Sequence, residues 1–385
     1  MKKDNKINVV ILGSTGTIGV NALEVLKRSK KHKVFGLSAG DNIELFKEQL
    51  KYFKPDYAVI KNERNRLLLE KEFKDITFFD SSEGLVKLVN FEEVDLVVSA
   101  IVGFAGLLPT YHALKKGKIV ALANKESLVA GGFLFDREEI RRIIPVDSEH
   151  SAIFQILKGR ETSFVRRIIL TASGGPFREY SQEDIKSITK EDALNHPNWS
   201  MGDKITIDSS TMINKALEII EAHYLFNLPY EKISVVIHPQ SVVHSIVEFN
   251  DSSLLAQMAY PDMKIPISEA LYYPLGEIFT YKRVDFSKLL NLSFMPPDLK
   301  KFPGLKFAKT VIENNEMGVV LNQANERAVD AFLKDKIKWM DIFNVIDYVM
   351  NNFKVNKIEN IKELEMTNLK VKEYTDKVIK SGIFK

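Results

Sequence analysis

Over its first 147 residues the chain alternates short apolar runs with segments of helical or mixed pattern. Strands that alternate with helices favour a parallel sheet covered on both faces, because each pair of parallel strands needs a crossover connection. We therefore predict an N-terminal α/β domain. Its predicted strands are residues 7–12, 34–38, 57–60, 95–100, 118–121 and 143–146.

The regular alternation fades after residue 147. Residues 168–172 and 234–238 are strand candidates, and residues 242–249 alternate apolar and polar side chains like a half-exposed antiparallel strand. Helical spacing returns from Leu305 onward. The predicted organisation is an α/β domain, a central α+β domain, a linker and a C-terminal helical bundle, at residues 1–147, 148–275, 276–298 and 299–385.

Composition narrows the classes of protein that this chain can represent. A net charge of +3 over 385 residues gives no sign of a nucleic-acid surface, and the absence of cysteine excludes disulfides and thiolate chemistry. The longest apolar run, residues 96–109, is too short for the roughly 20 residues of a membrane helix. We expect a soluble cytoplasmic protein with no nucleic-acid or membrane partner.

A glycine turn directly follows the first predicted strand. Gly13, Gly16 and Gly19 have the spacing GxxGxxG, and helical spacing begins at Ile18. Glycines let the backbone approach a pyrophosphate, whose charge the N-terminus of the helix stabilises. This context favours a Rossmann-like dinucleotide site. The alternative is a plain glycine-rich connection between strand and helix.

Two carboxylates follow the strand predicted at residues 143–146. If the extended conformation continues, Asp147 and Glu149 leave the same face of the chain. A hard divalent cation would relieve their repulsion, since such ions prefer carboxylate oxygens. On spacing alone, an ordinary acidic loop is the simpler interpretation.

Glu218 is the third candidate metal ligand. We expect residues 208–210 to cap the helix that contains it, and Asn214 and Lys215 to share its face. Such a helix start suits a phosphate. A surface helix with a Lys–Glu pair remains the alternative.

Two further loops are candidates for ligand binding. Residues 173–176 can offer a hydroxyl and backbone N–H groups to an anion, or can form an ordinary tight turn. His196, Trp199 and Gly202 lie in a predicted loop with the composition that a substrate lid needs.

Several sequence blocks together closely resemble those of the 1-deoxy-D-xylulose 5-phosphate reductoisomerase family. They run in order through nearly the whole chain, and several of them are specific to that family. The blocks are LGSTG (12–16), ALANKES (121–127), DSEHS (147–151), SGGPF (173–177), HPNWSMG (196–202), NK with E (214, 215 and 218), IHPQS (237–241), YPDM (260–263) and NE (325–326).

The resemblance implies an NADPH- and metal-dependent conversion of 1-deoxy-D-xylulose 5-phosphate to 2-C-methyl-D-erythritol 4-phosphate, in the non-mevalonate route to isoprenoids. It implies Mg²⁺, Mn²⁺ or Co²⁺ as the metal, a homodimer, and inhibition by compounds of the fosmidomycin type. NADPH would bind to residues 1–147, and catalysis and dimerisation would belong to residues 148–275.

The resemblance also assigns roles to individual residues. The metal ligands would be Asp147, Glu149 and Glu218. The catalytic residues would be Lys125, Asp147, Glu149, His196 and Glu218. Substrate would bind to Lys125, Ser148, Glu149, Ser173, His196, Trp199, Ser209, Asn214, Lys215 and Glu218. The cofactor would bind to Thr15, Gly16, Thr17, Ile18, Gly40, Asn42, Asn124, Glu126 and Gly202.

Asp41 departs from the family pattern, in which relatives often carry a basic or small polar residue at this position. An acidic residue near the end of the second strand ordinarily favours NADH, because it accepts from the ribose 2′-OH and repels a 2′-phosphate. We still expect NADPH, with a reduced preference. The alternatives to the reductoisomerase are a plain NAD(P)-dependent dehydrogenase of a sugar phosphate, which would not need a metal, and a nucleotide-sensing protein without turnover.

Overall fold

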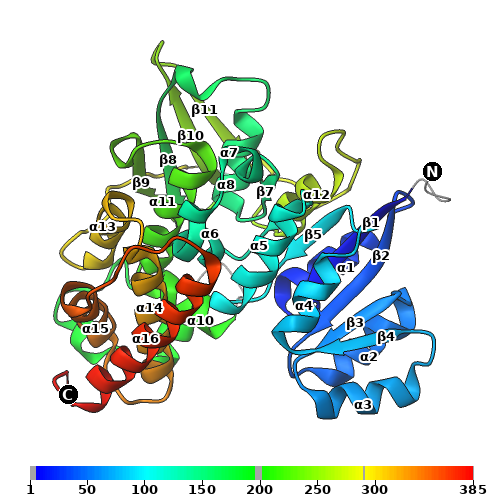
Figure 1. Ribbon diagram of the computed structural model, residues 1–385. Helices are drawn as coiled ribbons and strands as arrows, with labels where there is room; N and C mark the ends of the chain where they lie inside the picture. Colours follow the sequence, from blue (N-terminus) through cyan, green and yellow to red (C-terminus); the bar gives the residue numbers. More distant parts are fainter. Residues whose placement is uncertain (1–5, 196–201, 289–290, 385) are drawn as a thin grey trace. The chain divides into compact units, whose positions relative to one another are not determined.

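The computed structural model describes residues 6–195, 202–288 and 291–384 (Figure 1). Within those limits the chain forms two compact units. Unit 1 comprises residues 1–127, 135–151 and 262–281, and unit 2 comprises residues 128–134, 152–261 and 282–385. The domain boundaries expected after residues 147, 275 and 298 stay a prediction.

Unit 1 is built on a seven-stranded sheet with the strand order β4-β3-β2-β1-β5-β6-β7. All neighbouring strands are parallel. The order reverses at β1, so β2 and β5 flank it. The strands are β1 Ile7–Leu12, β2 His32–Ala39, β3 Tyr57–Ile60, β4 Thr77–Asp80, β5 Leu96–Ser99, β6 Ile119–Leu122 and β7 Ile143–Pro145.

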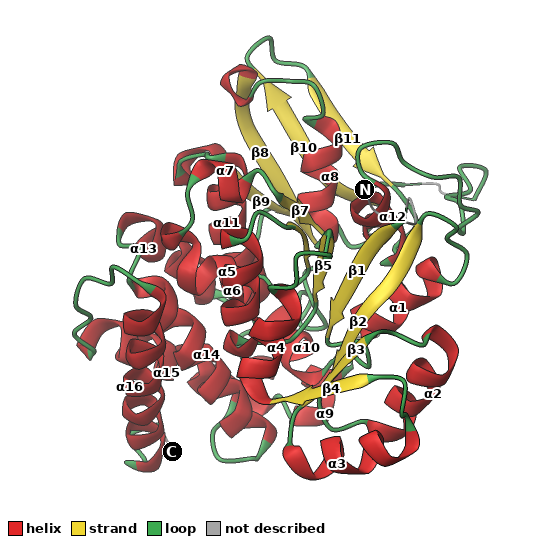
Figure 2. Ribbon diagram, turned by 45° about the vertical axis from the view of Figure 1, so that its right-hand side comes forward, coloured by secondary structure: helices red, strands yellow, loops and turns green. Residues whose placement is uncertain are grey.

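Helices cover both faces of this sheet. α1 packs beside α12 and α4 packs beside α5, and Figure 2 shows the two pairs on opposite sides of the sheet. The helices are α1 Thr17–Leu26, α2 Ile43–Phe53, α3 Glu63–Glu72, α4 Ser81–Val89, α5 Leu107–Lys115, α7 Arg137–Ile140 and α12 Lys264–Tyr272. α6 Glu126–Gly131 and α8 Ser148–Ile156 begin in unit 1 and end in unit 2.

Burial explains why the strands of unit 1 are uniformly apolar. Val9, Val10, Ile11 and Leu12 of β1 have no exposed surface. A central parallel strand contacts helices on both faces, so it cannot alternate apolar and polar side chains. The predicted α/β fold is confirmed, and the strand β4 at the edge of the sheet was missed.

Unit 2 contains a four-stranded mixed sheet with the order β11-β10-β8-β9. β8 and β9 are parallel, whereas β10 is antiparallel to both of its neighbours. The strands are β8 Val165–Ala172, β9 Ile233–Ile237, β10 Val243–Phe249 and β11 Leu254–Met258. β8, β9 and β10 were predicted, and the edge strand β11 was not.

Helices make up the rest of unit 2. In the C-terminal part α14 packs against both α15 and α16. Trp339 anchors this part, since its buried ring contacts Phe177 and its Nε1 donates to Ser210 Oγ at 3.0 Å. The helices are α9 Lys190–Leu194, α10 Asp203–Ser210, α11 Ile213–Phe226, α13 Phe307–Glu313, α14 Met317–Leu333, α15 Trp339–Asn352 and α16 Ile361–Lys380. The predicted α+β region and helical bundle are confirmed.

The segment before the C-terminal helices is tied to the sheet of unit 2. Ile237 and Met295 exchange two backbone hydrogen bonds of 2.8 and 3.0 Å. His238 Nδ1 donates to Ser293 O at 2.9 Å, and its ring stacks on Phe294. His238 therefore has a structural role. Among the helices that the structure describes, none is long and apolar enough to cross a membrane.

Candidate functional site

The glycine turn of unit 1 connects β1 to α1 as predicted. Gly13 has φ +83°, and a Cβ there would lie 2.8 Å from Ala100 O. A Cβ at Gly19 would lie 2.3 Å from Gly13 O. Gly16 is the N-cap of α1 and Thr17 its first residue; both are exposed, and no side chain caps the helix. The first N–H groups of α1 are therefore open to an anion.

Hydrogen bonds join this turn to the end of β2. Gly13 N donates to Ser38 Oγ at 3.0 Å, and Ser14 N donates to Ser38 O at 2.8 Å. Asn42 caps α2 by accepting from Leu45 N. The predicted cofactor residues after β1 and those after β2 thus belong to one framework in unit 1.

Asn124 holds together the loops that follow β5 and β6. Its Nδ2 donates to Ile101 O at 2.7 Å, Gly103 O at 2.9 Å and Glu126 Oε2 at 2.9 Å. Its Oδ1 accepts from Ser127 N at 3.0 Å. Asn124 and Glu126 are buried, so both fix the shape of this edge of the sheet.

The two carboxylates after β7 lie at the start of a helix. Ser151 N donates to Asp147 O at 2.8 Å, so Asp147 immediately precedes α8 and Glu149 lies in its first turn. The extended conformation does not continue past β7, because helix geometry begins at Ser148, but the carboxylate oxygens of Asp147 and Glu149 still lie within 4.8 Å of each other. Asp147 forms an ion pair with Lys125, and both side chains are largely buried. Ser148 Oγ donates to Glu149 Oε2 at 2.5 Å.

In unit 2, the face of α11 carries the residues predicted for the metal and the phosphate. Asn214 Nδ2 and Lys215 Nζ donate to the two carboxylate oxygens of Glu218, each at 2.5 Å. Lys215 Nζ also donates to Thr171 O at 2.6 Å, near the end of β8. Glu218 and Lys215 are buried. One amide group and one ammonium group thus hold this carboxylate in place.

The expected cap formed by residues 208–210 is wrong. These residues form the last turn of α10, and Met212, with φ +56°, separates them from α11. The carboxylate of Asp208, in α10, forms an ion pair with Lys204 at 2.8 Å and accepts a hydrogen bond from Asn325 Nδ2 at 2.8 Å. These partners, four and 117 positions away, keep its carboxylate from capping the next helix.

The loop after β8 packs against the end of α10. Gly174 and Gly175 have φ +84° and +65°, and a Cβ at Gly175 would lie 2.9 Å from Ser209 O. Gly175 N donates to Ser173 Oγ at 3.2 Å. Ser173 and Ser209, which are 36 positions apart, are therefore brought into one region of unit 2.

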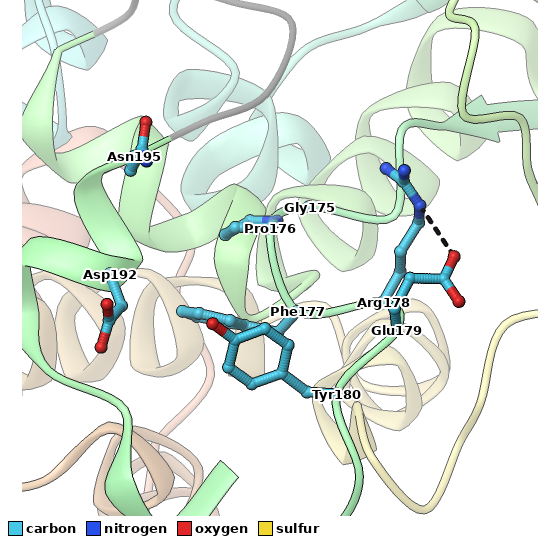
Figure 3. Close-up of a pocket in the computed structure, with 8 residues that line it drawn as sticks. All are labelled: Gly175, Pro176, Phe177, Arg178, Glu179, Tyr180, Asp192 and Asn195. Atoms are coloured by element: carbon cyan, nitrogen blue, oxygen red, sulfur yellow. Dashed lines mark hydrogen bonds and ion pairs between the residues drawn. The ribbon is translucent and has the colours of Figure 1, made fainter. Parts of the chain in front are cut away.

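A cavity of about 270 Å³ begins at this loop. Figure 3 shows the rings of Phe177 and Tyr180 side by side along it, whereas Arg178 and Glu179 pair with each other. The lining residues are Gly175, Pro176, Phe177, Arg178, Glu179, Tyr180, Asp192 and Asn195. Sequence reasoning did not identify this cavity.

Two predicted substrate residues, His196 and Trp199, lie outside the described residues. Gly202 is exposed and is the N-cap of α10. The ion pair of Lys61 with Asp41, at 2.9 Å, was not expected from the sequence. Its only signal in the sequence was a lysine directly after a predicted strand.

Models of one family match most of the chain. The model of 1-deoxy-D-xylulose 5-phosphate reductoisomerase matches residues 9–132, and models of its C-terminal domains match residues 143–226 and 258–374. The reductoisomerase of Thermodesulfovibrio yellowstonii is 46% identical over 363 residues, covering 92% of this chain and 95% of the relative. That of Geotalea daltonii is 48% identical over 365 residues, covering 93% and 95%.

Solved structures of the same family share the fold. A crystal structure of DOX-P reductoisomerase in complex with NADPH, fosmidomycin and magnesium has a TM-score of 0.92 and 36% identity, covering 97% of this chain and 98% of that one. The enzyme from Zymomonas mobilis in complex with NADPH has a TM-score of 0.90 and 36% identity, covering 98% and 100%. On these matches, this chain belongs to the 1-deoxy-D-xylulose 5-phosphate reductoisomerase family.

Proposed function

We propose that this chain catalyses the NADPH- and metal-dependent conversion of 1-deoxy-D-xylulose 5-phosphate to 2-C-methyl-D-erythritol 4-phosphate. The observation that carries the proposal is a lysine–carboxylate pair in each unit, at positions that the family resemblance assigns to the reaction. Lys125 pairs with Asp147 in unit 1, and Lys215 pairs with Glu218 in unit 2. Membership of the family over nearly the whole chain supports it.

NADPH is proposed to bind to unit 1, with its pyrophosphate at the open N-terminus of α1. Asn124 and Glu126 would support the nicotinamide end by fixing the loops after β5 and β6. The full proposed set is Thr15, Gly16, Thr17, Ile18, Gly40, Asn42, Asn124 and Glu126, with Gly202 from unit 2.

Asp147, Glu149 and Glu218 are the proposed ligands of Mg²⁺, Mn²⁺ or Co²⁺. The donor set fits, because all three are carboxylates and each accepts from a polar donor of its own unit, which a cation can replace. When bound, the cation supplies Lewis-acid polarisation of neighbouring substrate oxygens, and NADPH supplies a hydride.

The other side chains have the chemistry to hold the substrate. Lys125 and Ser148 would contact its hydroxyls, and the ammonium group of Lys125 would stabilise negative charge on oxygen while a carbon–carbon bond breaks and re-forms. Trp199 would cover the site and exclude water. The phosphate would be held by Ser173, His196, Ser209, Asn214 and Lys215.

The oligomeric state and the cellular location are part of this proposal as well. We propose a homodimer that works in the cytoplasm, as the family resemblance implies. Analytical ultracentrifugation of the purified protein tests the first, and cell fractionation tests the second.

The decisive experiment is an assay of NADPH oxidation with 1-deoxy-D-xylulose 5-phosphate, with and without EDTA. We expect turnover that EDTA abolishes and that added Mg²⁺ restores, with a branched tetrol phosphate as the product. Turnover that survives EDTA and leaves an unbranched product would identify a plain dehydrogenase. Cofactor binding without any turnover would identify a sensor.

A further inference from the structure

An exposed ion pair lies at the carboxyl edge of the unit 1 sheet. Lys61 directly follows β3, and Asp41 follows β2 by two residues; Lys61 Nζ lies 2.9 Å from Asp41 Oδ2. Ala39 and Ile60, the last residues of the two strands, are register partners. The side chains of Lys61 and Asp41 remain 65% and 75% exposed, so the pair is accessible to a ligand.

This pair is next to the glycine turn. The turn is hydrogen-bonded to Ser38, only three residues before Asp41. Gly40 lies between them, and a Cβ added there would meet nothing within 4 Å. The backbone between the turn and the ion pair therefore borders open space.

Dinucleotides bind such folds in a constant way. The pyrophosphate lies at the turn after the first strand, and the adenosine ribose reaches the end of the second strand. The ribose 2′ position carries a hydroxyl in NADH and a phosphate of about two negative charges in NADPH. The end of β2 is thus where the two cofactors are distinguished.

Charge decides what this edge can accept. Asp41 alone would repel a 2′-phosphate, but Lys61 neutralises it. An exposed ion pair contributes little to stability, so the lysine can turn toward a stronger anion at little cost. Arg66, on α3, is less available to a phosphate than Lys61, because two carboxylates already hold it: Asp80 at 2.7 Å and Glu70 at 2.7 Å.

We propose that Lys61 is the residue of this chain that recognises the 2′-phosphate of NADPH, and that Asp41 positions Lys61. The inference rests on the proposed function, since it assumes that NADPH binds at the glycine turn. Asp41, which by itself favours NADH, then contributes to a phosphate site by positioning Lys61.

The test is a titration of NADPH and of NADH against Lys61→Ala and Lys61→Arg. Lys61→Ala should weaken NADPH roughly tenfold or more, the loss expected for one charge-assisted hydrogen bond, and change NADH less than twofold. Lys61→Arg should keep NADPH within about threefold, because it keeps the charge. High salt should reduce the difference between Lys61→Ala and the unmodified protein.

Lys33→Ala is the matched control. Lys33 forms an exposed ion pair with Asp56 at 2.5 Å, at the opposite end of the same two strands. The Lys33→Ala change should therefore alter the affinity for neither cofactor. The double variant Asp41→Asn with Lys61→Ala should bind NADPH at least about threefold better than Lys61→Ala alone, because it removes the unpaired carboxylate.

Equal losses of NADPH and NADH affinity, or no loss of either, would overturn the inference. If the unmodified protein bound neither cofactor, the proposed function would fail instead. If it turned over NADPH with the sugar phosphate while Lys61→Ala bound NADPH normally, only the role of Lys61 would fail.

Discussion

The two units hold their proposed catalytic carboxylates in different ways. In unit 1, Lys125 follows β6 and Asp147 follows β7, and these neighbouring parallel strands bring the pair together. In unit 2, Lys215 and Glu218 lie one helical turn apart on α11, and Thr171 of β8 fixes the lysine. The sheet positions one pair, and a helix with a distant strand positions the other. The two residues of the unit 1 pair therefore follow different strands, whereas those of the unit 2 pair come from one helix.

The largest effect should come from Glu218→Gln, which keeps the shape of the side chain and removes its charge. We expect turnover to fall more than about 100-fold, because even partners outside the first ligand shell of a metal typically contribute 10–100-fold. NADPH affinity should stay within twofold, since the proposed cofactor turn lies in unit 1. Steady-state kinetics and fluorescence titration measure the two quantities.

Glu231→Gln is the control for this comparison. Glu231 is an exposed glutamate of unit 2 and should tolerate the same change without loss of activity. Near-normal turnover of Glu218→Gln at low Mg²⁺ would remove Glu218 from the proposed metal ligands.

The same contrast explains how much of the site could be predicted. In unit 1 the glycine turn, Lys125 and Asp147 all follow strands, and short apolar runs alone located those strands. In unit 2 the role of residues 208–210 depends on Lys204 and Asn325, and only a folded chain brings Asn325 to α10. The local sequence pattern therefore predicted that residues 208–210 cap the following helix, whereas in the folded chain they form the end of α10.

A second test compares two glycines of unit 2 that both have positive φ. Gly175→Ala should lower the free energy of unfolding by about 2–4 kcal/mol, because it adds backbone strain and places a Cβ 2.9 Å from Ser209 O. Gly159 has φ +70° but open space around it, so Gly159→Ala should cost only about 1–2 kcal/mol. Urea denaturation measures both.

Kinetics of the same two variants refine this test. Gly175→Ala should also raise the KM for the sugar phosphate, because the proposed phosphate residues Ser173 and Ser209 meet at that loop, whereas Gly159→Ala should not. If the two variants had the same KM for the sugar phosphate, the loop at Gly175 would have no part in holding the phosphate.

Edge strands limited the prediction in both units. Among the strands that the structure describes, β4 and β11 each have one neighbour. Leu254 and Leu255 of β11 are exposed, so no apolar alternation marks this strand. Lys61 was not among the predicted site residues because an exposed charge has no periodicity; only its pairing with Asp41 in the folded chain suggests the proposed role.

The smallest expected effect concerns pH and should be confined to unit 1. His32 is buried in β2, with Nδ1 2.7 Å from Ser29 Oγ and Nε2 2.9 Å from the O atom of Leu271 in α12. Burial lowers the pKa of His32 below its ordinary value of 6.5, although the hydrogen bond to Leu271 opposes the shift. The unfolded chain therefore binds a proton more readily than the folded one.

It follows that His32 contributes its full stability above about pH 6.5 and loses it as the pH falls toward its lowered pKa. Between pH 7 and pH 5, hydrogen exchange corrected for its intrinsic rate should show unit 1 losing on the order of 1 kcal/mol of protection. The amides of β2 and α12 should report this loss, and those of β8 in unit 2 should not. His32→Gln cannot titrate, so it should remove the difference between the two pH values even if it lowers stability at both. A pH dependence that survived in His32→Gln, or that appeared equally in β8, would assign the effect to other groups.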